Sequence, residues 1–209
     1  MNERHEHLIA LAPERTVPNM KSSPQLLKTS LAALPAAGLA LALVLGGCVH
    51  ETRVARGQYL ATAIACADCH TPKIKGPKGP EPDQTRWMAG HAEDVQLPPP
   101  PKLAASPWNV VEADVTAWAG LWGVSYSANL TPDINTGLGI WTEDMFIQAM
   151  RTGKHMGSGR DILPPMPWNY FANLTDDDLK AIFAYLRSLP PVSNRVPDPV
   201  PPGGAPGFE

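Results

Sequence analysis

A short motif, Cys66-Ala67-Asp68-Cys69-His70, constrains the fold of this chain more than any other feature. Its two cysteines are separated by two residues, about one turn of a helix, and a histidine follows the second cysteine directly. A group of this kind can bind zinc, cycle between dithiol and disulfide, or attach a haem covalently.

The rest of the chain offers little support for zinc or for redox cycling. A structural zinc site needs four ligands, but the chain has only three cysteines and no second pair. His50, His91 and His155 have no motif spacing. A thioredoxin-like pair is found beside a βαβ pattern, which this sequence lacks. The motif therefore predicts c-type haem attachment, with Cys66 and Cys69 as thioether links and His70 as an axial iron ligand.

An uncharged apolar run, residues 31–45, is too short to span a bilayer comfortably. Lys21 and Lys28 precede it, as in a secretory signal peptide. The run ends in "LGGC", which resembles the lipobox of bacterial lipoproteins and ends at Cys48. We therefore expect a lipoprotein-type signal peptide over residues 20–47 and a lipid anchor on Cys48. The protein would then be exported and held at the periplasmic face of a bacterial membrane.

Composition and sequence pattern divide the rest of the chain. Residues 1–19 mix acids and bases, unlike the start of a signal peptide, and are expected to be a start-site extension. Residues 48–193 form one expected domain, and the proline-rich tail 194–209 is expected to be flexible. The 24 prolines and 17 glycines indicate many loops, and a net charge of −3 gives no footprint for nucleic acid.

Three segments are predicted to be helical: about 52–66, 142–152 and 175–189. Thr142 and Thr175 are expected N-caps, and the last segment has apolar residues at helical spacing. Between the first two helices lies a long proline-rich stretch, about 71–140, with no alternation strong enough to predict a sheet. The pattern favours an all-α fold with a long irregular loop insertion.

The order of these features resembles the class I cytochrome c family. The blocks "NLTPDINTGLGIWTEDMFIQAMRTG" and "PPMPWNYFANLTDDDLKAIFAYLRSLPPV" are similar to cytochrome c subunits of bacterial membrane alcohol and gluconate dehydrogenases. The resemblance covers about residues 53–193 and implies a cytochrome c-like helical domain around a haem. It also implies that the first and last helices cross, with Gly57 close to Tyr185. This chain has one haem motif where those subunits carry three.

The second axial ligand is predicted to be Met166. Pro164, Pro165 and Pro167 restrict the backbone around it, so its thioether can be presented at low entropic cost. It also precedes the last helix, where the resembled family has its ligand. Met156, in the flexible "HMGSG" loop, is the rival.

Four further residues are predicted to lie near the haem. Trp141, Arg151 and Lys154 are candidates for contact with the haem propionates, from charge and position. Trp168 is expected to shield the haem from water.

These predictions favour an electron carrier. Histidine and methionine ligands leave no open position on the iron for a substrate, and the sequence contains no arrangement that indicates catalysis. The leading interpretation is a periplasmic, membrane-anchored cytochrome with one covalent haem c. Its partners would be redox proteins such as a dehydrogenase, an oxidase or another cytochrome. Two alternatives stay open: an electron-transfer subunit of a dehydrogenase complex, and a haem enzyme or gas sensor with a weak distal ligand.

Overall fold

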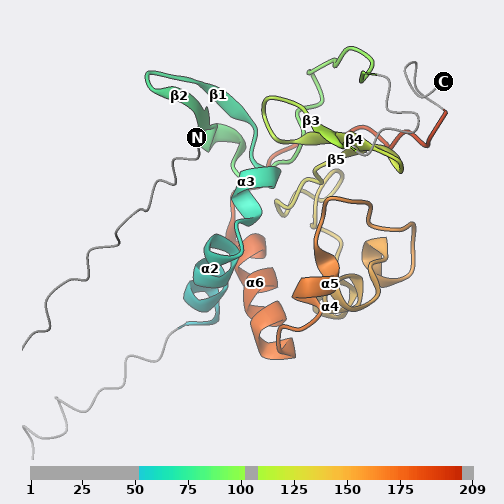
Figure 1. The fold of residues 1–209 in the computed structure, drawn as a ribbon. Coiled ribbons are helices and arrows are strands. Elements are labelled where there is room, and N and C mark those ends of the chain that lie inside the picture. Colours follow the sequence, from blue (N-terminus) through green and yellow to red (C-terminus); the bar gives the residue numbers. More distant parts are fainter. Residues whose placement is uncertain (1–51, 102–107, 204–209) are drawn as a thin grey trace, which may run out of the picture. The chain divides into compact units, whose positions relative to one another are not determined.

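The computed structural model describes residues 52–101 and 108–203 (Figure 1). Three longer helices are joined by loops, short helices and short strands. The helices are α2 (Arg53–Ala63), α3 (Cys66–His70), α4 (Glu143–Thr152), α5 (Trp168–Phe171) and α6 (Asp176–Ser188), with two 3₁₀ turns at Gln84–Arg86 and His155–Gly157. The three predicted helical segments are therefore confirmed, although the first is interrupted before Cys66. Within these ranges, no helix is long and apolar enough to cross a membrane.

Helices α2 and α6 cross in close contact, as the family resemblance implied. Gly57 is buried at the crossing, and a Cβ atom there would lie 1.8 Å from the Ala181 carbonyl oxygen and 2.9 Å from Tyr185 Cβ. Only glycine permits this approach of the two backbones. Arg56 also donates to the Asp178 carboxylate at 3.0 Å across the same crossing.

A single apolar core holds the three longer helices together. Its buried side chains include Leu60, Phe146, Leu179 and Leu186, and the centroids of the Phe146 and Phe183 rings lie 5.3 Å apart. Burial of large aliphatic and aromatic side chains is the main favourable contribution to such packing.

Threonine hydroxyls cap the N-terminus of each longer helix. The side chains of Thr142 and Thr175 accept hydrogen bonds from the backbone N–H groups of Met145 and Asp178, which confirms both predicted caps. Thr52 does the same for α2. Each cap satisfies a backbone donor that has no partner inside the helix.

The stretch from 71 to 140 contains short strands, so the prediction of a wholly irregular insertion was wrong, and the predicted all-α class holds only for the helical part of the domain. A hairpin joins β1 (Lys73–Gly76) to β2 (Gly79–Pro82), and a three-stranded antiparallel sheet has the order β3 (Val110–Val111), β4 (Ala117–Gly120), β5 (Gly123–Tyr126). The strands have two to four residues, and three consecutive residues of β5 are buried. Such short strands have too few residues to show a period of two.

The tail was predicted to be flexible, and its described part, residues 194–203, makes specific contacts with the domain. Asn194 is buried, and its amide donates to the carbonyl oxygens of Ala89 and His91 at 2.7 and 2.8 Å. Val200 pairs with Val124 in an antiparallel bridge. The predicted start extension, signal peptide and Cys48 lipidation site lie outside the described residues.

Candidate functional site

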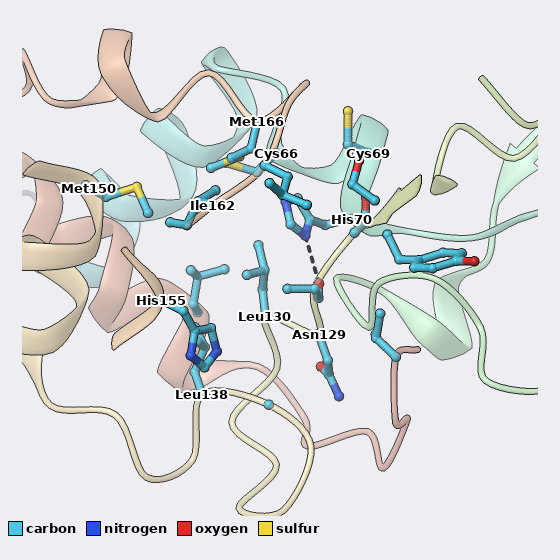
Figure 2. A pocket seen from close by; sticks show the side chains of 18 of the residues that line it. Cys66, Cys69, His70, Asn129, Leu130, Leu138, Met150, His155, Ile162 and Met166 are labelled. Carbon is cyan, nitrogen blue, oxygen red and sulfur yellow. Dashed lines mark hydrogen bonds between the residues drawn. The ribbon is translucent and has the colours of Figure 1, made fainter. Parts of the chain in front are cut away.

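The domain contains a cavity of about 580 Å³ (Figure 2). Its walls come from three helices, α3, α4 and α6, from the segment after β5, and from the loop that precedes α5. Cys66, Cys69, His70 and Met166, which the sequence singled out, all line it. Most of the remaining lining is apolar, including Leu130, Leu138, Phe146, Ile162 and Ile182. The size and apolar lining are those of a site that encloses a small organic molecule.

The short helix α3 presents the two cysteines at the cavity. Ala65 has a left-handed backbone (φ 58°), which separates α2 from α3. Both thiols are free of disulfide bonds. Burial raises the pKa of Cys66 to about 11 and also raises the pKa of Cys69. Because reactive redox cysteines have a lowered pKa, the local environment does not favour thiol–disulfide cycling.

His70 is oriented by a hydrogen bond to the backbone. Its Nδ1–H donates to the carbonyl oxygen of Ala128 at 2.8 Å (Figure 2). A carbonyl oxygen can only accept, so this bond leaves the lone pair on Nε2. Burial lowers the pKa of His70, which keeps the ring neutral at neutral pH. A neutral imidazole with a free Nε2 is suited to ligate iron, so these residues fit the haem that the motif predicts.

Met166 lies in the loop that leads into α5. Its side chain is partly buried and packs against the helical core, and it lines the cavity. Its rival Met156 has a left-handed backbone (φ 54°) in the turn after α4 and is not among the lining residues. The structure thus brings Met166, rather than Met156, to the same cavity as His70.

Of the three predicted propionate contacts, Trp141 lines the cavity, whereas Arg151 and Lys154 do not. Trp168, which was predicted to shield the haem from water, is not among the lining residues either. Arg151 donates to the Ala172 carbonyl and to Asp176, and Lys154 pairs with Asp161. The Trp168 ring lies over Gly153, where a Cβ atom would be 2.3 Å from it.

Other polar side chains also line the cavity, among them Asn129, His155, Arg160 and Arg195, which the sequence did not assign to the haem site. The His155 ring meets Trp141 edge to face, with centroids 5.0 Å apart. Burial, and then the nearby charge of Arg160, lower the pKa of His155. The two arginines are the cations in the lining that could pair with carboxylates of a bound cofactor.

The glycine-rich segment around Arg160 gave a weak sequence signal for this role. Arg195 gave none, because it lies in the tail that was expected to be flexible.

Zinc binding was an alternative interpretation of the motif. No group of three or more histidine, cysteine, aspartate or glutamate side chains comes together to hold a metal ion within residues 52–101 and 108–203.

Comparison with known proteins assigns the class. The family model described as Cytochrome c matches residues 54–190, so the chain belongs to the cytochrome c family, as the resemblance indicated. Membership implies a covalently bound haem c.

Several curated relatives are parts of dehydrogenases. The chain is 42% identical over 68% of its length to a subunit of nicotinate dehydrogenase from Pseudomonas putida. It is 32% identical over 78% of its length to the gluconate 2-dehydrogenase cytochrome c subunit of Pantoea cypripedii. It is 29% identical over 91% of its length to the cytochrome c subunit of quinone alcohol dehydrogenase of Gluconobacter oxydans.

The chain spans only part of each of these proteins: 9%, 30% and 32% of their lengths, respectively. Family and relatives together support electron transfer as the function.

Proposed function

We propose that this protein is an electron carrier with one covalent haem c, exported and lipid-anchored through Cys48 at the periplasmic face of a bacterial membrane. One observation carries the electron-transfer proposal: Cys66, Cys69, His70 and Met166 line a single apolar cavity. When bound there, a haem would supply reversible one-electron chemistry.

Each residue has a distinct role in this proposal. Cys66 and Cys69 would hold the group covalently by thioether bonds, and His70, oriented by its hydrogen bond to Ala128, would bind the iron through Nε2. Met166 would bind the iron through its thioether sulfur. The apolar walls limit access of water, which raises the reduction potential, as does a methionine ligand. With both axial positions filled by the chain, no position is left for a substrate, so we expect no catalysis by this chain itself.

The proposed electron source is a dehydrogenase whose active site lies on another polypeptide. The names of the relatives favour this, since two of them are cytochrome c subunits of alcohol and gluconate dehydrogenases. Purification of the native protein from membranes under mild conditions tests the idea. A large flavin- or quinone-containing subunit in the same fraction would indicate a stable complex, and its absence would favour a freely exchanging carrier.

Covalent haem attachment can be tested directly. Denatured wild-type protein should keep its haem on a gel, and the double variant Cys66→Ser/Cys69→Ser should lose haem staining. Extraction of haem from the wild type by acidified solvent would contradict the c-type assignment.

The axial assignment is tested by spectroscopy of oxidised and reduced protein. Met166→Ala should lose the long-wavelength sulfur-to-iron band and allow the reduced iron to bind carbon monoxide, whereas the matched variant Met156→Ala should keep wild-type behaviour. Carbon monoxide binding by the wild type would instead favour a gas sensor or haem enzyme.

The anchor is tested by cell fractionation. Cys48→Ser should move the protein from the membrane to the soluble periplasmic fraction, because the acyl chains provide the membrane affinity. Unchanged membrane association would require another anchor.

A further inference from the structure

The loop that carries Met166 has few backbone N–H groups that could hydrogen-bond to the rest of the domain. Three of residues 163–167 are prolines, which have no backbone N–H. The Met166 N–H is used inside the loop, on the Leu163 carbonyl at 3.3 Å. The loop must therefore be held through its carbonyl groups or its side chains.

One hydrogen bond supplies this connection. Across the part of the chain that the structure describes, a single hydrogen bond joins residues 163–166 to another segment: the Ser125 hydroxyl donates to the Pro164 carbonyl oxygen at 2.6 Å. Ser125 is buried, lines the cavity and belongs to β5. The contact lies two residues before Met166.

The hydroxyl of Ser125 is itself fixed in direction. The indole Nε1–H of Trp122 donates to its oxygen at 3.1 Å, so its proton is directed to Pro164. The Trp122 ring packs over Gly120, where a Cβ atom would lie 2.3 Å from it. Strand β5 is paired with β4 and bridged to the tail at Val124. The donor therefore sits on a supported element.

We infer that Ser125 is a positioning residue for the Met166 ligand, and that the sheet β3–β5 serves to hold the methionine loop over the cavity. The inference rests on the proposed assignment of Met166 as an axial ligand. Without the Ser125 hydroxyl, the Pro164 carbonyl loses its partner within the domain, which favours loop conformations that turn this oxygen to water. Those conformations withdraw Met166 from the cavity. Trp122 acts through Ser125 by orienting its hydroxyl.

The test uses a matched pair of variants in the holo protein. Ser125→Thr keeps a hydroxyl, whereas Ser125→Val has nearly the same shape as that threonine without one. We expect Ser125→Val to raise the fraction of molecules with detached methionine about tenfold, the size of effect expected for one lost hydrogen bond. It should weaken the sulfur-to-iron band and speed carbon monoxide binding by the same factor. Ser125→Thr should keep both near wild type, and Trp122→Phe should give a smaller change in the direction of Ser125→Val.

Two further variants provide controls. Ser188→Ala removes a serine hydroxyl that also donates to a backbone carbonyl, that of Tyr185 at 2.7 Å, but lies outside the cavity lining, so it should change neither readout. Ser125→Ala adds no atom, so it separates loss of the hydroxyl from crowding by the valine methyl groups.

The outcomes are distinct. If Ser125→Val and Ser125→Ala keep the wild-type band and carbon monoxide rate while Met166→Ala loses the band, Ser125 has no positioning role and the ligand assignment stands. If Met166→Ala keeps the band, the ligand assignment fails, and the positioning role fails with it.

Discussion

Helices α2, α4 and α6 are held together by one large apolar core, whereas the segments around β3–β5 and the tail have only a small apolar cluster around Ala119 and Val124 and depend more on a few buried polar side chains. In the helical part, Leu60, Phe146 and Leu179 share one core. In the other part, Asn129 donates to the Val192 carbonyl at 2.8 Å and Asn194 binds the backbone at Ala89 and His91. The proposed axial ligands come from outside the three longer helices. The positions of these two ligands therefore depend on the buried polar contacts as much as on the apolar core.

The comparison predicts the largest loss of stability where the helical part is tightest. Gly57→Leu should destabilise the domain by roughly 4 kcal/mol, because the new side chain would occupy the space of the α6 backbone at Ala181. Urea unfolding of the holo protein, followed by circular dichroism, measures this. The exposed neighbour Gln58 provides the control, since Gln58→Leu should change stability by less than about 0.5 kcal/mol. Equal effects of the two would mean that the crossing is not tightly packed.

The next largest loss of stability should come from a single side chain of the tail, that of Asn194. Asn194→Ala removes two donated hydrogen bonds and one accepted from the Glu93 N–H at 2.9 Å. We expect a loss of roughly 3 kcal/mol, because buried backbone groups lose their partners. Hydrogen exchange should show faster exchange at residues 90–93. The exposed Asn173, which also donates to two carbonyls, is the control, and an equal effect of Asn173→Ala would refute the importance of burial.

The buried carboxylate of Asp83, directly after β2, gives the stability of the domain a pH dependence. Hydrogen bonds from Thr85, and then those from Arg86, lower the pKa of Asp83. A lowered folded-state pKa means that this contribution to stability is complete above the unfolded value of about 3.9 and is lost as pH falls through the folded value. Asp83→Asn should cost roughly 1.5 kcal/mol at pH 7. The difference from wild type, measured by unfolding at a series of pH values, should shrink below about pH 4; a constant difference would contradict the role of the charge.

The smallest effect should come from a helix cap. Thr175→Ala should destabilise the domain by about 1 kcal/mol, because the Asp178 N–H loses its acceptor at 3.1 Å. Thr175→Ser keeps the hydroxyl and should recover most of the loss in the same unfolding experiment. A loss as large as that of Asn194→Ala would show that the helical part also depends on individual polar contacts.

The same difference between the helical part and the polar contacts separates what the sequence could predict from what it could not. Helix positions and caps are encoded locally, so the segments ending near Thr152 and Ser188 were predicted from spacing and from their threonine caps. The attachment motif is also local, and Met166 was identified from its prolines together with the family resemblance.

The polar contacts are not local, and the sequence did not indicate them. Asn194 and Ala89 are separated by 105 residues, and Ser125 and Pro164 by 39. A single asparagine or serine in a loop carries no pattern that identifies such a distant partner. For the same reason the sequence could not show that Arg151 turns toward Asp176, or that Arg195 reaches the cavity.

The crossing of α2 and α6 also affects the order in which the domain can form. Arg56 and Asp178 are in contact although 122 residues separate them along the chain. Synthesis proceeds from the N-terminus, so the cysteines are made long before the helix that completes their surroundings. In a growing chain both thiols are therefore exposed until α6 has been made. Contacts between such distant segments also slow folding, which extends the period during which Cys66 and Cys69 stay accessible.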